Sequence, residues 1–131
     1  MMSGELIYLT CTIVFTALLW IPYVLNQISI QGLVNAVGYP ENPVPLAPWA
    51  QRLKAAHYNA VENLVLFAPL VFVVEIAGLT SPATQLSCLV FFVARIAHAV
   101  TYALAVPWAR SLSFAVGYLA LLGIVYQIIT A

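Results

Sequence analysis

The chain has 131 residues, of which 64% are hydrophobic and only 6% are charged, and its formal net charge is zero. A soluble domain carries about a quarter charged residues, so this chain has too few polar side chains to cover a water-soluble globule. With a mean hydropathy of +1.03, a soluble enzyme, a disordered chain and a nucleic-acid-binding protein are poor interpretations. The composition predicts an all-helical membrane protein, because long apolar runs cross a bilayer as helices.

Four apolar stretches approach or exceed the roughly 20 residues that a membrane span needs. In chain order, we expect spans over about residues 5–28, 49–76, 82–104 and 107–129. Residues 1–131 then form a single four-helix transmembrane domain. Pro22 predicts a kink within the first span, because proline cannot donate the helical hydrogen bond to the preceding turn.

The connectors between these stretches differ in length. Residues 31–48 contain four prolines and two glycines, which predicts an extramembrane loop that is not helical throughout. Residues 78–81 are short enough to make the second and third spans an antiparallel hairpin. Val106 and Pro107 predict a tight turn before the fourth span.

Basic residues near span ends predict the orientation of the chain. Arg52 and Lys54 border the first connector, Arg110 borders the third, and neither the termini nor the second connector has any. We therefore expect connectors one and three in the cytoplasm and both termini on the non-cytoplasmic side. Cys11 and Cys88 lie in separate apolar runs without metal-ligand spacing, so neither a disulfide framework nor a metal site is expected.

Polar residues within a span are costly and mark candidate functional sites. In the second span Arg52, Ala56, Asn59 and Glu62 fall within about a third of the helix circumference, which predicts a polar stripe facing the interior of the bundle. Arg52, like Lys54, fits a solvated helix entrance equally well. Glu62 lies three turns inside the helix, where a carboxylate needs a partner.

The third span carries Arg95, His98 and Tyr102 on one face. Arg95 is placed near mid-membrane and must be paired or hydrated, and we expect Glu62 to be its partner. A purely structural pair is an equal alternative, and Tyr102 also fits the interfacial aromatic belt. At the start of the fourth span, Arg110 either points its guanidinium at an anionic ligand or serves only to set the topology.

The run Arg52-x-x-x-Ala56-x-x-Asn59-x-x-Glu62 resembles the signature of the MAPEG family, the membrane-associated proteins in eicosanoid and glutathione metabolism. Arg95-Ile96-Ala97-His98-x-x-x-Tyr102, followed by Pro107-x-x-Arg110-Ser111, is similar to that family's third and fourth helices. The resemblance implies a four-helix bundle in a homotrimer, with glutathione between neighbouring subunits near the cytoplasmic side. It also implies a small member of bacterial type, in the inner membrane.

Residue roles follow from the same resemblance. It implies Arg110 and Ser111 as catalytic residues, with Arg110 stabilising the glutathione thiolate. The glutathione-binding residues that it implies are His57, Asn59, Glu62, Arg95, His98 and Tyr102. The chain departs from the family pattern at Gln51, where glutamate is usual, and at Ala55, where many members have a basic residue. It also departs at Tyr58, where some have arginine, and at Phe114, where some have tyrosine. These departures leave fewer cations for the two carboxylates of glutathione.

The leading interpretation is a glutathione transferase or peroxidase that uses glutathione as co-substrate, needs no metal and receives a lipophilic electrophile from the membrane lipid. A small multidrug or proton-coupled transporter is the alternative, because four spans with one intramembrane carboxylate suit it. The expected pairing of that carboxylate with Arg95 argues against proton exchange. A non-catalytic membrane scaffold is the third interpretation.

Overall fold

The computed structural model describes residues 1–131, and all of its regular structure is helical. The helices are α1 (Gly4–Leu18), α2 (Trp20–Val37), α3 (Pro48–Ile76), α4 (Pro82–Ala103) and α5 (Ala109–Ile129). Since α1 and α2 form one long bent helix, four helices are long and apolar enough to cross a membrane. The expected four-span helical architecture is confirmed, although the first helix continues to Val37 instead of ending near residue 28.

The interruption between α1 and α2 lies at Leu19, whose backbone N–H bonds to the carbonyl of Thr16 at 3.3 Å, three residues earlier instead of four. Pro22 follows one turn later. Proline has no N–H for the carbonyl of Leu18, and its ring crowds that carbonyl, so the helical hydrogen-bond pattern is interrupted on the N-terminal side of the proline. The interruption near Pro22 is confined to the hydrogen-bond pattern, because Leu19 keeps right-handed helical angles (φ −64°, ψ −23°), and the strongly non-helical backbone lies further on, at Gly32.

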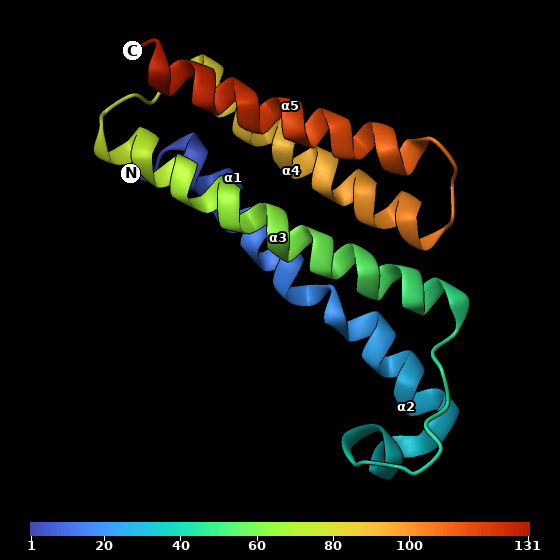
Figure 1. Ribbon diagram of the computed structural model, residues 1–131. Coiled ribbons are helices and arrows are strands. Elements are labelled where there is room, and N and C mark those ends of the chain that lie inside the picture. The colour runs from blue at the N-terminus through green and yellow to red at the C-terminus, as the bar shows by residue number, and fades with distance from the viewer.

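Helices α4 and α5 form the most closely packed pair, and Figure 1 shows them side by side along most of their length. Gly117 of α5 faces Ala94, and a Cβ added there would lie 3.5 Å from the Ala94 Cβ. The turn between the two helices includes two non-glycine residues with positive φ, Ala105 (55°) and Trp108 (65°). The expected turn at Val106 and Pro107 is confirmed.

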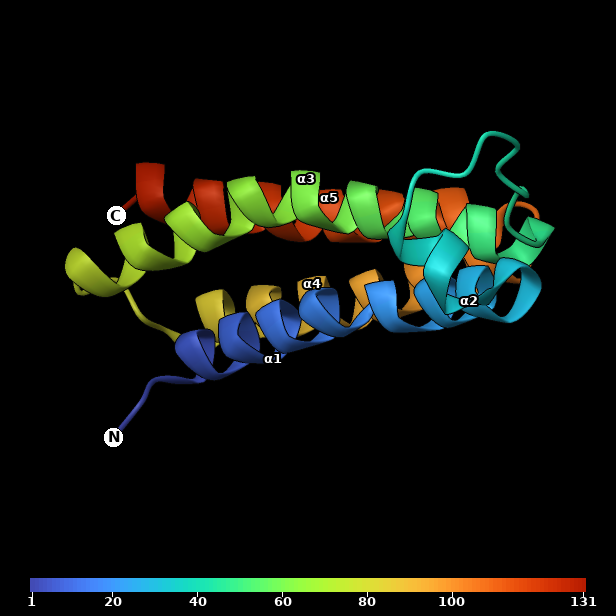
Figure 2. The same cartoon turned by 90° about the horizontal axis from the view of Figure 1, so that it is seen from below.

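The bundle has two apolar clusters with a polar layer between them. The cluster nearer the termini contains Phe67 and Phe91, whose rings stack at 4.0 Å. The second cluster, which includes Tyr23 and Ala56, lies nearer the connectors 38–47 and 104–108. Both termini lie at one end of the bundle and these two connectors at the other (Figure 2). Arg95 lies on α4 between Phe91 of the first cluster and Ala99 of the second. Its charge therefore has an apolar cluster on either side of it along the bundle axis.

Candidate functional site

Arg95 is the largest fully buried side chain of the protein, at 2% exposure. Its Nη2 donates to Asn59 Oδ1 on α3 at 2.6 Å and lies 3.3 Å from Nδ1 of His98. Because a guanidinium only donates, this geometry makes Nδ1 of His98 the acceptor and leaves the ring proton on Nε2. Arg95 Nε is buried without any acceptor in the chain. The middle of the bundle thus holds a guanidinium with no carboxylate beside it.

The expected ion pair between Arg95 and Glu62 is wrong. Asn59 takes the place of the carboxylate at the guanidinium, and the Glu62 side chain is exposed on the outside of the bundle. The reason is helical geometry, because Glu62 directly precedes the buried Asn63 and so points about 100° away from it. The interior-facing stripe holds for Ala56 and Asn59 and fails for Glu62.

His57 also lies apart from the Arg95 cluster. Its Nδ1 is hydrogen-bonded to the hydroxyl of Tyr23 at 2.7 Å, and the two rings lie 5.8 Å apart. Tyr23 is the one buried residue of α2, so this contact attaches α2 to α3. The structure therefore gives His57 a partner on a different helix from Arg95 and His98.

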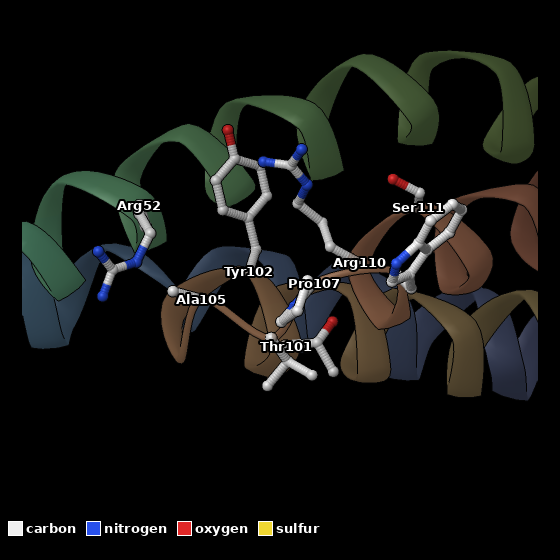
Figure 3. Close-up of a pocket in the computed structure, with 9 residues that line it drawn as sticks. Arg52, Thr101, Tyr102, Ala105, Pro107, Arg110 and Ser111 are labelled. Carbon is white, nitrogen blue, oxygen red and sulfur yellow. The ribbon is translucent and has the colours of Figure 1, made fainter.

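A cavity of about 220 Å³ opens at the end of the bundle near the connectors. Figure 3 shows Tyr102 and Arg110 together in it, with the Arg110 guanidinium carbon 4.8 Å from the centre of the Tyr102 ring. Ser111 follows Arg110 on α5 and lines the same cavity. These three residues, expected from the sequence to share a site, are brought together. The lining contains Arg52, Thr101, Tyr102, Ala105, Val106, Pro107, Trp108, Arg110 and Ser111, and no carboxylate.

Arg52 is a cavity residue that the sequence left undecided between a site and a solvated helix entrance. Its Nε donates to the carbonyl of Ala103 at 3.0 Å, which ties the start of α3 to the end of α4. Its other two nitrogens have no acceptor in the chain. The sequence signal for Arg52 as a site residue was its position at the N-terminal end of the polar stripe that also contains Asn59, on one face of α3.

Tyr102 connects the cavity with the buried cluster. Its ring meets the ring of His98 edge-on at 5.6 Å, and it also lies beneath the Arg110 guanidinium. Arg52 and Arg110 line the cavity, whereas Arg95 lies outside its lining, buried in the bundle beside His98 and Asn59. Such an arrangement suits an anionic ligand, because guanidinium groups bind carboxylates and thiolates without changing their own charge.

The family model of MAPEG matches residues 7–130, which include the cavity, the buried cluster and nearly the whole chain. The chain belongs to the MAPEG family. A comparison with curated proteins finds no match. Membership, together with the four long apolar helices, makes this MAPEG protein an integral multi-pass membrane protein.

Proposed function

We propose that this MAPEG protein is a membrane-bound glutathione-dependent enzyme, of transferase or peroxidase type, that acts on a lipophilic electrophile. The observation that carries the proposal is the cavity in which Arg52 and Arg110 meet no carboxylate. Glutathione has two carboxylates and an ionisable thiol, so it is a co-substrate that such a cavity suits. No metal is needed for this chemistry.

The proposed chemistry is attack by the glutathione thiolate on an electrophile that enters from the lipid. The thiolate is the reactive form, and a guanidinium beside the sulfur favours it over the thiol. Arg110 has that role in the proposal, its side chain oriented by the Tyr102 ring at 4.8 Å. The neighbouring Ser111 hydroxyl is a second donor to the sulfur or to a carboxylate.

Asn59, Arg95 and His98 are proposed to bind the peptide part of glutathione. Arg95 supports this because its Nε is buried without an acceptor, which a ligand carboxylate would supply. The resemblance also assigns His57 and Glu62 to this part of the site. The Tyr23 hydrogen bond occupies His57 Nδ1 in this chain, and Glu62 joins the site only if a neighbouring copy covers it.

The exposed Glu62 also supports a homotrimer. Val61, Val65 and Leu66 beside it are exposed as well, so the carboxylate stands on an apolar face at membrane depth. Lipid solvates a carboxylate poorly, and polar contacts between helices favour association within a bilayer. Native mass spectrometry from mild detergent tests this, and a spectrum of monomers and dimers alone would contradict it.

Thermal unfolding of the purified protein with and without glutathione tests the proposed function. We expect glutathione to raise the melting temperature of the wild type and of Lys54→Gln, and to raise that of Arg110→Gln less. Lys54 is a matched control because it lies at the same end of the bundle but extends toward the Tyr58 ring, 5.9 Å away. An equal glutathione shift in both variants would remove Arg110 from the binding site.

One observation favours the transporter as a second candidate. Since Arg95 is bonded to Asn59, no ion pair with Arg95 prevents Glu62 from exchanging a proton for a cation. A melting-temperature rise with lipophilic cations, absent in Glu62→Gln and without any glutathione effect, would favour this candidate. A protein stabilised by neither ligand would favour the non-catalytic scaffold.

A further inference from the structure

The end of α2 carries apolar side chains on the outside of the bundle. Tyr23 is the one buried residue of α2, whereas Val34 is 83% exposed and Tyr39, just beyond the helix, is fully exposed. The exposed apolar residues of this segment are Ile30, Leu33, Val34, Val37 and Tyr39. A contiguous exposed apolar surface marks a contact with a partner or a membrane.

A backbone bend at Gly32 directs this segment sideways. Gly32 has φ 80° and ψ 160°, which interrupt the helix, and a Cβ added there would meet nothing within 4 Å. Glycine is therefore required by the backbone angle and not by lack of space. In Figure 1 the end of α2 and the connector that follows it lie well away from α4 and α5. Residues 30–39 form what we call the side arm.

Three hydrogen bonds connect polar groups of the side arm, α2 and the connector that follows. Asn35 Nδ2 donates to the carbonyl of Gln31 at 3.1 Å, and Gln31 Oε1 accepts from the backbone N–H of Val44 at 3.4 Å. Asn26 Oδ1 accepts from the N–H of Ala47 at 3.0 Å and fixes the end of the connector. Internal satisfaction of polar groups is what a poorly hydrated environment requires. Most of the outward-facing side chains of the arm are apolar, and Asn35 is the exposed polar one.

Charge and aromatic residues indicate which environment the side arm meets. No charged residue lies between Glu5 and Glu41, so no side chain of the arm carries a charge that would oppose its transfer into the bilayer surface. Tyr39, Trp49 and Trp108 are exposed and flank the connectors at this end of the bundle. Tyrosine and tryptophan gather at the boundary between membrane and water, and the side arm lies at that level.

We propose that the side arm is an interfacial anchor that inserts Leu33, Val34 and Val37 into the surface of the bilayer beside the bundle. Since the arm is uncharged, its binding depends on the apolar surface and not on anionic headgroups. Gly32 makes the bend that brings the segment from the direction of the span to the plane of the membrane. The proposal does not depend on glutathione activity.

Spin-label accessibility tests the anchor in the full chain. Cys11→Ala removes the half-buried thiol, while Cys88 is buried and the parent variant measures its background labelling. A nitroxide at Val34→Cys, in vesicles of phosphatidylcholine alone, should be relaxed by oxygen several-fold more than by a water-soluble nickel complex. A label at Asn42→Cys, an exposed position in the same connector, should show the reverse.

Two results would overturn the proposal. Nickel accessibility at Val34→Cys equal to that at Asn42→Cys would place the arm in water, and protection from both reagents would place a second copy over it. Val37→Cys, one turn further along, repeats the measurement where the first label prevents folding. Adding phosphatidylglycerol should leave the oxygen preference unchanged, and a preference that appears only with this anionic lipid would contradict an uncharged anchor.

The bend itself is tested by Gly32→Ala, because alanine is strained at φ 80°. In this variant the label at position 34 should gain nickel accessibility relative to the parent. The same accessibility with alanine at position 32 would show that the bend does not place the arm.

Discussion

Asn59 on α3 and Arg95 on α4 are joined by a hydrogen bond of 2.6 Å, from the guanidinium Nη2 to the amide oxygen. A neutral amide thus holds a buried cation that would ordinarily pair with a carboxylate. Asn63 Nδ2 donates to the Asn59 backbone carbonyl at 2.8 Å and lies 3.3 Å from the Asn59 amide oxygen. The amide is therefore oriented with its oxygen toward Arg95, and the stability of this layer depends on it.

We expect Asn59→Ala to lower the free energy of unfolding by roughly 1.5–3 kcal/mol, the range for a hydrogen bond to a charged group. The loss leaves the Arg95 guanidinium with one fewer acceptor in a buried position. Glu62→Gln is the matched comparison on the same helix and should change stability less, because Glu62 has no partner in the chain. Equal melting temperatures of Asn59→Ala and wild type in mild detergent would show that Arg95 is held in another way.

The sequence predicts the four spans well because the length and the apolar character of each run determine them directly. It also predicts that Asn59 faces the bundle, since helical periodicity places it near Ala56 on one side of α3. Periodicity does not determine whether the Glu62 side chain faces the bundle, because Glu62 lies only about 60° from Asn59 around the helix. Whether such a neighbour is inside or outside depends on how α3 and α4 cross, and this is a property of packing.

The cavity was predictable in part. Tyr102, Arg110 and Ser111 follow from their positions on two consecutive spans, and they do meet. The contribution of Arg52 depends on the turn that contains Ala105 and Trp108, both with positive φ. No residue type in that turn signals such a conformation, because alanine and tryptophan rarely adopt it. The contact of Tyr23 with His57, 34 positions apart in the chain, likewise has no local signal.

Tyr23→Phe should lower the free energy of unfolding by about 0.5–1.5 kcal/mol, the net contribution of one hydrogen bond. The ring remains to fill its site, so the change isolates the 2.7 Å bond to His57. Tyr39→Phe, at a fully exposed tyrosine, is the control and should leave the melting temperature unchanged. If Tyr23→Phe has the same melting temperature as Tyr39→Phe, His57 has found another partner.

Glu5 stabilises the opposite end of the bundle. Its Oε1 accepts from Thr84 Oγ1 at 2.5 Å and from the backbone N–H of Ser81 at 3.2 Å, at the N-terminus of α4. A carboxylate there satisfies free donors and complements the helix dipole. Glu5→Ala should therefore cost about 1.5–3 kcal/mol in thermal or denaturant unfolding. Glu41→Ala removes an exposed carboxylate from the connector, and a loss as large as that of Glu5→Ala would contradict this assignment.

Reporter fusions in a bacterial host test the orientation. Arg52, Lys54 and Arg110 all lie at the connector end of the bundle, so we expect that end in the cytoplasm and both termini outside. A phosphatase that is active only outside the cytoplasm should work when fused after Ala131, and a fluorescent protein that matures only inside should stay dark. The opposite pattern would place the cavity on the non-cytoplasmic side.

Arg110→Ala should impair catalysis more than glutathione binding. Arg110 lies in the first turn of α5, at the cavity, with its guanidinium over the Tyr102 ring. A guanidinium beside the sulfur meets a full charge only when the thiol ionises, so it stabilises the thiolate and the transition state more than bound glutathione. Asn59 and Arg95 would instead contact the peptide part in every state, and their loss should weaken binding uniformly.

The expected loss for Arg110→Ala is about 2–4 kcal/mol in the activation free energy of turnover, the size of one preorganised electrostatic donor. Thiolate absorbance and turnover of a generic electrophile, both at saturating glutathione, measure it. Lys54→Ala removes a cation from the same end of the bundle without touching the cavity, and it should keep wild-type values. If thiolate formation and turnover persist in Arg110→Ala, another group stabilises the thiolate. Arg52 would then be the candidate, because it is the other guanidinium in the cavity lining.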